Sequence, residues 1–181
     1  MKADVLLTGE RIDLRPLSIA EIDGPYLGWL NDSEVCRYNS HGEVEYTKEM
    51  AREYVERVTD SPEYLVLAIL TKAGKHIGNI SLQEINARNR AAEFAILLGD
   101  KDYWGKGFAK EASLLIIRYG FERLDLHRIY CGTSIENAAM QKLAHSLGFQ
   151  EEGRRREAFF KRGAFTDVVE YGLLKSEFRA A

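Results

Sequence analysis

The stretch Leu98-Gly-Asp-Lys-Asp-Tyr-Trp-Gly-Lys-Gly-Phe-Ala-Lys-Glu-Ala112 decides the fold of this chain of 181 residues. An apolar run ends at Leu98, glycines follow at positions 105 and 107, and a helical pattern begins at once. Such a strand–loop–helix connection directs free backbone N–H groups and the positive end of the helix dipole at one point, where an anion such as a pyrophosphate binds. Two glycines spaced in this way would also suit an ordinary tight turn.

Two other phosphate-binding loops do not match this stretch. A dinucleotide-binding loop needs a third glycine three residues after Gly107, where this chain has Lys110. A Walker A loop needs a glycine five residues before Gly105 and a serine or threonine after Gly-Lys, but the chain has Asp100 and Gly107 there. The stretch therefore excludes both of these classes.

The flanking sequence predicts one α/β domain over residues 1–181. We expect strands over residues 11–16, 64–71, 76–83, 91–98 and 128–134, and a final hairpin that pairs 154–161 with 165–174. We expect helices over residues 18–30, 47–58, 108–124 and 137–147, the first with a capping box of Ser18 and Glu21. The predicted buried stripes are Met50, Tyr54 and Val58 in the second helix, and Ala109, Ala112, Ile116 and Tyr119 in the third. Because strands precede, separate and follow helices, the sheet should be mixed and mostly antiparallel.

The composition excludes several classes of protein. With 45% hydrophobic and 29% charged residues the chain is of the globular kind, and its net charge of −3 does not suit a nucleic-acid-binding protein. Cys36 and Cys131 are far apart and form no metal-binding or disulfide pattern, so we expect two small buried side chains, no metal site and a reducing compartment. The apolar runs are too short for a membrane span or a signal peptide, which predicts a cytoplasmic protein.

Together these segments resemble the GNAT superfamily, in particular its ribosomal-protein N-terminal (Rim-type) acetyltransferases and their small-molecule relatives. The family's central Gln/Arg-x-x-Gly-x-Gly/Ala motif matches residues 102–109, with Asp102 in place of the usual Gln or Arg. Its second cofactor motif matches residues 135–149, its closing hairpin 152–168, and its opening segment 9–16. The resemblance covers nearly the whole chain. It implies an acyltransferase with the GNAT fold that uses acetyl-CoA as acetyl donor and no metal.

The resemblance also implies which residues contact the cofactor. Main-chain groups of Ile96, Leu97 and Leu98 would bond the pantetheine arm. The backbone of the loop would hold the pyrophosphate, through Tyr103, Trp104, Gly105, Lys106, Gly107, Phe108 and Ala109. The two aromatic residues of this set could equally anchor the loop. Asn137 would contact the cofactor, cap its helix, or do both, and Lys142 would either approach a CoA phosphate or remain a solvated charge.

Direct transfer of an acetyl group to an amine needs a base, because the conjugate acid of the amine has a pKa near ~10. Glu93 is the first candidate, since it lies on the strand before the loop, and apolar neighbours would raise its pKa. A purely structural role for Glu93 is equally open. Glu157 on the last hairpin is the second candidate and Glu84 the third. The resemblance assigns stabilisation of the thioester oxygen to a backbone N–H near Leu98.

The proton donor to the leaving thiolate is less well defined. Relatives place a serine three residues, or a tyrosine seven residues, after the asparagine that begins the helix, and here these positions are Met140 and Ala144. Neither side chain can donate a proton. Ser134, His145 or a nearby tyrosine would have to substitute, or solvent would protonate the thiolate. Because no proton donor is identified, a protein that binds CoA without catalysing acetyl transfer remains an alternative.

Three functions follow, in this order. The first is acetylation of a small-molecule amine, either a free or nucleotide-linked amino sugar or a polyamine; the second is acetylation of ribosomal-type protein N-termini; the third is CoA binding alone. We expect the acceptor pocket between residues 29–46 and the last hairpin. The acidic residues there would suit a cationic acceptor or merely form an exposed face; they are Asp32, Glu34, Glu43, Glu45 and Glu49. A nucleotide-linked acceptor would need the basic run 154–156 nearby, and family analogy suggests a homodimer.

Overall fold

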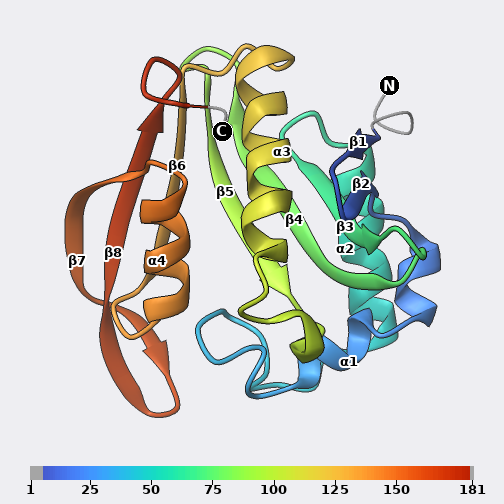
Figure 1. Cartoon of the computed structure of the whole chain (residues 1–181). Coiled ribbons are helices and arrows are strands. Elements are labelled where there is room, and N and C mark those ends of the chain that lie inside the picture. Colours follow the sequence, from blue (N-terminus) through green and yellow to red (C-terminus); the bar gives the residue numbers. More distant parts are fainter. Residues whose placement is uncertain (1–5, 180–181) are drawn as a thin grey trace.

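A computed structural model describes residues 6–179 and contains one eight-stranded sheet with helices on both faces (Figure 1). The strands are β1 (Leu7–Thr8), β2 (Ile12–Pro16), β3 (Leu65–Thr71), β4 (His76–Asn86), β5 (Ala91–Leu98), β6 (Arg128–Ser134), β7 (Gln150–Lys161) and β8 (Ala164–Leu174). The helices are α1 (Tyr26–Asn31), α2 (Lys48–Asp60), α3 (Phe108–Glu122) and α4 (Ala138–Ser146), with 3₁₀ turns η1 (Ile19–Asp23) and η2 (Lys101–Tyr103).

The sheet has the order β1-β2-β3-β4-β5-β6-β8-β7, and β5 with β6 is its single parallel pair among the described residues. The prediction of a mixed, mostly antiparallel sheet is therefore confirmed. Two strands are longer than predicted, since β4 continues to Asn86 and β7 begins at Gln150.

Strand β3 explains why the sheet needs helices on both faces. Its alternate side chains divide between two cores: Leu65, Leu67 and Ile69 join the cluster with α3 and α4, whereas Val66 and Ala68 join the cluster with α1 and α2. A strand buried on both faces is a continuous apolar run, as this one is. Figure 1 shows α3 and α4 on the near face of the sheet and α2 on the other.

The pairing of β5 with β6 is short and divides the sheet into two parts. Only residues 91–93 of β5 pair with residues 128–130 of β6, after which the two strands diverge towards the loop before α3 (Figure 1). On its other side β5 stays paired with β4 as far as Leu98. The backbone groups of residues 94–98 that face β6 are consequently not used by that strand.

The prediction of one continuous helix over residues 18–30 is wrong. The capping interaction is present, because the Glu21 carboxylate accepts hydrogen bonds from the Ser18 N–H (2.8 Å) and Oγ (2.7 Å). However, the chain forms the 3₁₀ turn η1 and the short helix α1 with Gly24-Pro25 between them. A proline has no N–H to donate and keeps the residue before it out of the helical region, so one helix cannot pass through this dipeptide.

The other helices occur where predicted, but their buried stripes are shifted. Helix α2 buries Ala51, Val55 and Val58, while Met50 is exposed. Helix α3 buries Ala112 and Ile116 as predicted, together with Ser113, Ile117, Gly120 and Phe121, whereas Ala109 and Tyr119 are only partly buried. In both helices the buried face is therefore rotated slightly around the helix axis from the predicted one.

Candidate active site

The loop between β5 and α3 has the geometry of an anion cradle. Gly105 (φ 68°) and Gly107 (φ 83°) both adopt left-handed backbone conformations, and Gly107 is the N-cap of the 15-residue helix α3. A Cβ placed on Gly105 would meet no atom within 4 Å, so the loop is open at that residue. The free N–H groups at the start of α3 follow two residues later, an arrangement that suits an anion such as a pyrophosphate.

The two aromatic residues of the loop make anchoring contacts. The Trp104 indole N–H donates to the Leu98 carbonyl oxygen at 2.6 Å. The Tyr103 ring packs edge-on to Phe108, with a centroid separation of 5.0 Å, and the Lys75 ammonium lies 5.1 Å from the Tyr103 centroid. These contacts fix the loop to the strand that precedes it and to the helix that follows it. They agree with the anchoring role, which the sequence left open.

Arg11, the residue before β2, braces the same loop and was not among the predicted site residues. Its Nε donates to Glu111 Oε2 at 2.7 Å and its Nη1 donates to the Lys106 carbonyl oxygen at 2.9 Å. Its guanidinium also lies 4.5 Å from the centroid of the Phe108 ring. Burial alone would raise the pKa of Glu111, but the hydrogen bonds and charge of Arg11 outweigh it and lower that pKa. The signal was present in the opening Gly9-Glu-Arg segment.

The base of the loop packs against α1 through Gly99. The Trp29 indole of α1 lies so close to Gly99 that an added Cβ would overlap its Cγ, Cδ2 and Cε3 atoms. The buried His76 ring stands edge-on to this indole, at a centroid separation of 4.9 Å. Its Nε2 lies 2.9 Å from both the Gly78 carbonyl oxygen and Asn79 Oδ1. Burial lowers the pKa of His76.

A cavity of about 300 Å³ lies beside β5, on the side of α1 and α2. Its lining comes from α1, α2, β3, β4, β5 and the loop after α1, and the residues are Tyr26, Leu30, Asn39, Ser40, His41, Tyr46, Tyr54, Val66, Asn79, Ile80, Ser81, Gln83, Ala95, Ile96 and Leu97. Alternate residues of β4, namely Asn79, Ser81 and Gln83, give it a row of neutral polar side chains. The remaining polar side chains of the lining are Asn39, Ser40, His41 and the three tyrosines. The cavity therefore meets β5 on the segment that is not paired with β6.

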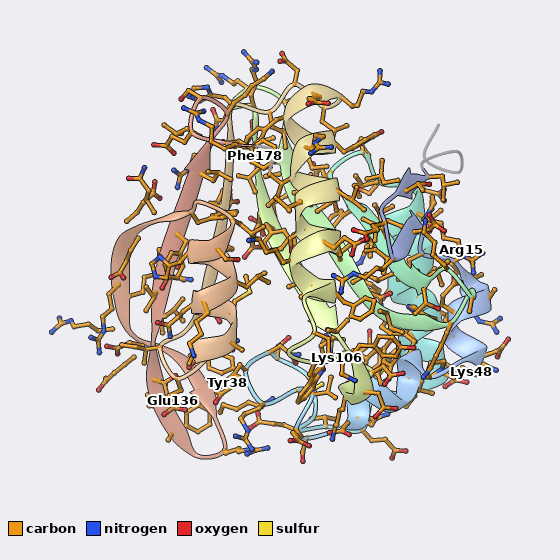
Figure 2. All side chains as sticks on the ribbon, in the orientation of Figure 1. Arg15, Tyr38, Lys48, Lys106, Glu136 and Phe178 are labelled. Carbon is orange, nitrogen blue, oxygen red and sulfur yellow. The ribbon has the colours of Figure 1, made fainter. Side chains whose placement is uncertain are left out.

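The loop over residues 39–46 closes one side of this cavity and is fixed at both ends. Asn31 and the backbone of Tyr46 exchange two hydrogen bonds (2.9 and 2.7 Å). At the other end the Lys161 ammonium donates to the carbonyl oxygens of Asn39 (2.8 Å) and His41. Figure 2 shows the side chains of this region, with Tyr38 labelled, between Lys106 of the cofactor loop and Glu136 at the start of α4.

The acidic residues of the acceptor region do not line the cavity. Asp32 and Glu34 both pair with the Lys101 ammonium, at 2.8 and 2.6 Å, and the hydrogen bond from Lys101 lowers the pKa of Asp32. Glu43 accepts a hydrogen bond from the backbone N–H of Arg162 at 2.7 Å. The remaining two, Glu45 and Glu49, are exposed. The acidic bias seen in the sequence thus serves contacts within the protein and its solvated surface.

The three candidate bases lie outside the cavity lining. Glu93 is half-buried, burial raises its pKa, and its Oε2 accepts a hydrogen bond from the Gln83 amide at 2.8 Å. Glu93 is therefore bonded to Gln83, which lines the cavity, and is not part of the lining itself. Glu84 is exposed and accepts a hydrogen bond from Tyr130 at 3.2 Å. Glu157 is exposed at an irregular part of β7, where its backbone N–H donates to Asp167 at 2.7 Å.

The candidates near α4 are engaged in local structure. Ser134 is buried, and its Oγ lies 3.3 Å from Thr166 Oγ1 and accepts a hydrogen bond from the Glu136 N–H at 3.2 Å. Asn137 caps α4 by accepting from the Met140 N–H at 3.2 Å, while its Nδ2 donates to Thr133 at 3.0 Å. The capping role is therefore present, and contact with a cofactor remains a prediction.

The sequence singles out four further positions of α4, namely 140, 142, 144 and 145. Met140 is partly buried and Ala144 is buried. His145 is exposed and stands edge-on to the Tyr171 ring at 5.4 Å. Lys142 is exposed, and its role towards a CoA phosphate remains a prediction.

The described part of the chain, residues 6–179, contains both cysteines. Cys36 and Cys131 are free and buried, as predicted. Within this range no cluster of histidine, cysteine, aspartate or glutamate residues could hold a metal ion. No helix of the described part is long and apolar enough to cross a membrane.

Comparison with known proteins agrees with this geometry. The family described as acetyltransferase (GNAT) domain matches residues 11–150. An uncharacterized N-acetyltransferase, p20, of Bacillus licheniformis is 32% identical over 93% of this chain and 96% of its own length. A spermidine N(1)-acetyltransferase of Vibrio cholerae is 32% identical over 82% and 84%. The crystal structure of spermidine N-acetyltransferase from Vibrio cholerae in complex with CoA and spermine superposes with a TM-score of 0.85 at 28% identity, covering 93% of this chain and 98% of that one.

Proposed function

The chain belongs to the GNAT family of acetyltransferases, and we propose that it acetylates the primary amine of a small hydroxylated molecule such as a free amino sugar. The family, the α/β fold, the enzyme class and acetyl-CoA as the donor agree with what the sequence predicted. The acceptor is the part that we infer from this chain's own residues. The cavity beside β5 is the observation that carries the proposal.

The position of the cavity supports acceptor binding there. Its wall includes Ala95, Ile96 and Leu97, the segment of β5 whose edge is free of β6. In the family this strand edge bonds the pantetheine arm, so a thioester at its end would lie against the cavity. With about 300 Å³ the cavity is at the small end of the range for small-molecule sites, about 300–1,000 Å³. It therefore fits a small amine or one end of a longer one.

The chemistry of the lining favours a neutral, hydroxyl-bearing acceptor. Asn79, Ser81 and Gln83 can exchange hydrogen bonds with hydroxyl groups, and no carboxylate is among the residues that line the cavity. Two arginines of the basic run are already paired, Arg154 with Asp167 and Arg155 with Glu170 at 2.6 Å. Within the described residues this leaves only Arg156 of the run without an ion pair for a phosphate-bearing acceptor. We therefore favour a free amino sugar over a nucleotide-linked one.

A polyamine is the second candidate, because relatives that align over most of this chain are spermidine acetyltransferases. The faces of Tyr26, Tyr46 and Tyr54 could attract a cationic chain. Carboxylates that would hold the distal ammonium groups are missing from the lining, which places this candidate behind the first.

The chain's other residues have distinct tasks in the proposed reaction. When bound, acetyl-CoA supplies an activated acyl group. The amides at the start of α3 hold the pyrophosphate, and Arg11 keeps that loop in place through Lys106 and Glu111. A backbone N–H on the free edge of β5 stabilises the developing charge on the thioester oxygen. Because Ser134 is buried and bonded to Thr166, the leaving thiolate takes its proton from the attacking amine.

The test is an amine panel assayed with acetyl-CoA by release of free thiol. The panel contains free and nucleotide-linked amino sugars, polyamines, amino acids and peptides with ribosomal N-termini. We expect turnover on free amino sugars and at most slow turnover on the rest. The control is Gly107→Val, because a β-branched residue cannot adopt φ 83° without strain, and this variant should lose turnover together with CoA binding. Turnover confined to polyamines or peptides would refute the acceptor assignment.

A further inference from the structure

We infer that His41 is the base that accepts the proton of the acceptor's ammonium group; this inference rests on the proposed acetylation of an amine in the cavity beside β5. His41 lies on the loop after α1, in a segment that the sequence analysis treated only as part of the acceptor region. Four observations on the described residues carry the assignment: its place in the cavity, its unused ring nitrogens, the way its loop is fixed, and the lack of a rival in the lining.

The imidazole is placed at the cavity with its nitrogens available. His41 is among the lining residues, and its partly buried ring packs edge-on to the Tyr46 ring at a centroid separation of 5.1 Å. Within residues 6–179 neither ring nitrogen has a hydrogen-bond partner; the hydrogen bonds at this residue involve its backbone. Glu93 differs, because its Oε2 is already bonded to Gln83.

The loop over residues 39–46, which carries His41, is held from two sides. Lys161, from the β7–β8 hairpin, donates to the backbone carbonyl oxygen of His41, and Asn31, from α1, bonds the backbone of Tyr46 on the other side. The loop thus reaches from α1 to the hairpin, and residues 95–97 of β5 line the same cavity. A base fixed in this way faces the segment of β5 at which we place the thioester.

No other group in the cavity lining is suited to accept a proton at neutral pH. The remaining titratable residues there are Tyr26, Tyr46 and Tyr54, and burial raises the pKa of each, so they stay protonated. Burial, and secondarily the charge of Lys161, lower the pKa of His41 below its usual 6.5. The nearby Glu43 is bonded to the Arg162 backbone. His41 is therefore neutral at pH 7 and carries a free lone pair.

The step is balanced as follows. The ammonium group, whose pKa falls as the cavity removes its water, passes one proton to a ring nitrogen of His41. The amine nitrogen then attacks the thioester carbonyl carbon, so that a C–N bond forms and the C–S bond breaks, with its electron pair left on sulfur. The second proton of the nitrogen passes to the thiolate. The products are the amide, CoA with a free thiol, and imidazolium, which returns its proton to solvent.

The experiment measures kcat/KM against pH for His41→Gln on the best acceptor of the panel. We expect a loss of roughly 10²–10⁴-fold, the usual contribution of general base catalysis. The wild type should lose activity at low pH as His41 becomes protonated, at a pH below its usual pKa of 6.5, and the variant should lack this acidic limb. The matched control is His127→Gln, an exposed histidine away from the cavity, which should keep wild-type activity and the limb.

A second variant separates chemistry from folding. His41→Ala removes the ring, and added imidazole should restore part of its activity, which an effect on loop structure would not allow. CoA affinity and melting temperature of both variants should match the wild type. Wild-type-like activity of His41→Gln with the acidic limb intact would overturn the inference and leave the proposed function standing. Failure of the wild type on the whole panel, with CoA still bound, would instead reject the proposed function and this inference with it.

Discussion

Replacing Gly99 by alanine should destabilise the protein through a single steric overlap. A Cβ at this position falls on the Cγ, Cδ2 and Cε3 atoms of Trp29, whereas carbon atoms need about 3.5–4.0 Å. The indole must therefore retreat by roughly 1 Å or more within a well-packed core. It has little room, because Trp29 is 8% exposed and its ring contacts His76 edge-on.

The expected cost lies at the upper end of the range for overpacked cores, about 3 kcal/mol. For a chain of this size that corresponds to a fall in melting temperature of roughly 6–12 °C. Thermal unfolding followed by calorimetry measures it. Calorimetric titration with CoA should also show weaker binding, because the Gly99 and Asp100 N–H groups fix the loop base to the Ile77 carbonyl oxygen, both at 3.0 Å.

The matched control makes the same chemical change one residue away from Trp29. Gly28 is exposed in α1, and an added Cβ there would meet no atom within 4 Å. Gly28→Ala should therefore be neutral or stabilise by up to about 1 kcal/mol, since alanine favours helix. The double variant Gly99→Ala with Trp29→Phe should lose less unfolding free energy than the two single variants lose together, because the smaller ring leaves space for the added Cβ. A Gly99→Ala protein that melts as high as the wild type would refute the reasoning.

Three further measurements test other parts of the structure. Arg11→Met should weaken CoA binding by about 1 kcal/mol, roughly fivefold in Kd, because a half-exposed charged brace of Lys106 is lost; an unchanged Kd by calorimetry would exclude the brace. Burial raises the pKa of Glu93 above 4.5, so the wild type should lose stability as pH rises through that pKa while Glu93→Gln does not. Denaturant unfolding at about pH 4 and pH 7 should therefore show the difference in unfolding free energy between the two proteins changing in favour of the variant at pH 7. A difference that stays constant with pH would contradict this. Cys36 and Cys131, whose pKa values burial raises (for Cys131 to about 12), should resist a thiol reagent in the native protein and react only after unfolding; rapid labelling of the native protein would argue against their burial.

Much of the fold could be predicted because its signals are local. The apolar run of β3, the glycines of the cofactor loop and the turn at Arg162-Gly163 each specify structure within a few residues. The break at Gly24-Pro25 was equally local and could have been seen, since proline excludes the helix that was drawn through it. The shifted stripe of α2 was harder, because Met50 and Ala51 are both apolar, and only the packing against β3 selects Ala51.

The proposed acceptor site could be predicted only in outline, because distant segments build it. Asp32 and Glu34 suited either a cationic acceptor or an exposed acidic face, yet both pair with Lys101, far along the chain. His41 carried no motif, and its role depends on Lys161, which is 120 residues away. Pairings of this kind follow from the three-dimensional arrangement and leave no periodic pattern in the sequence.

The strand order also bears on how the protein is made. The order β1-β2-β3-β4-β5-β6-β8-β7 nearly repeats the order of synthesis, so almost every strand can pair with one that has already left the ribosome. Closure of the loop over residues 39–46 comes later, because the hairpin that holds it through Lys161 and Arg162 is among the last parts to emerge. A nascent chain can thus form the loop between β5 and α3 well before the cavity beside β5 is closed by the hairpin.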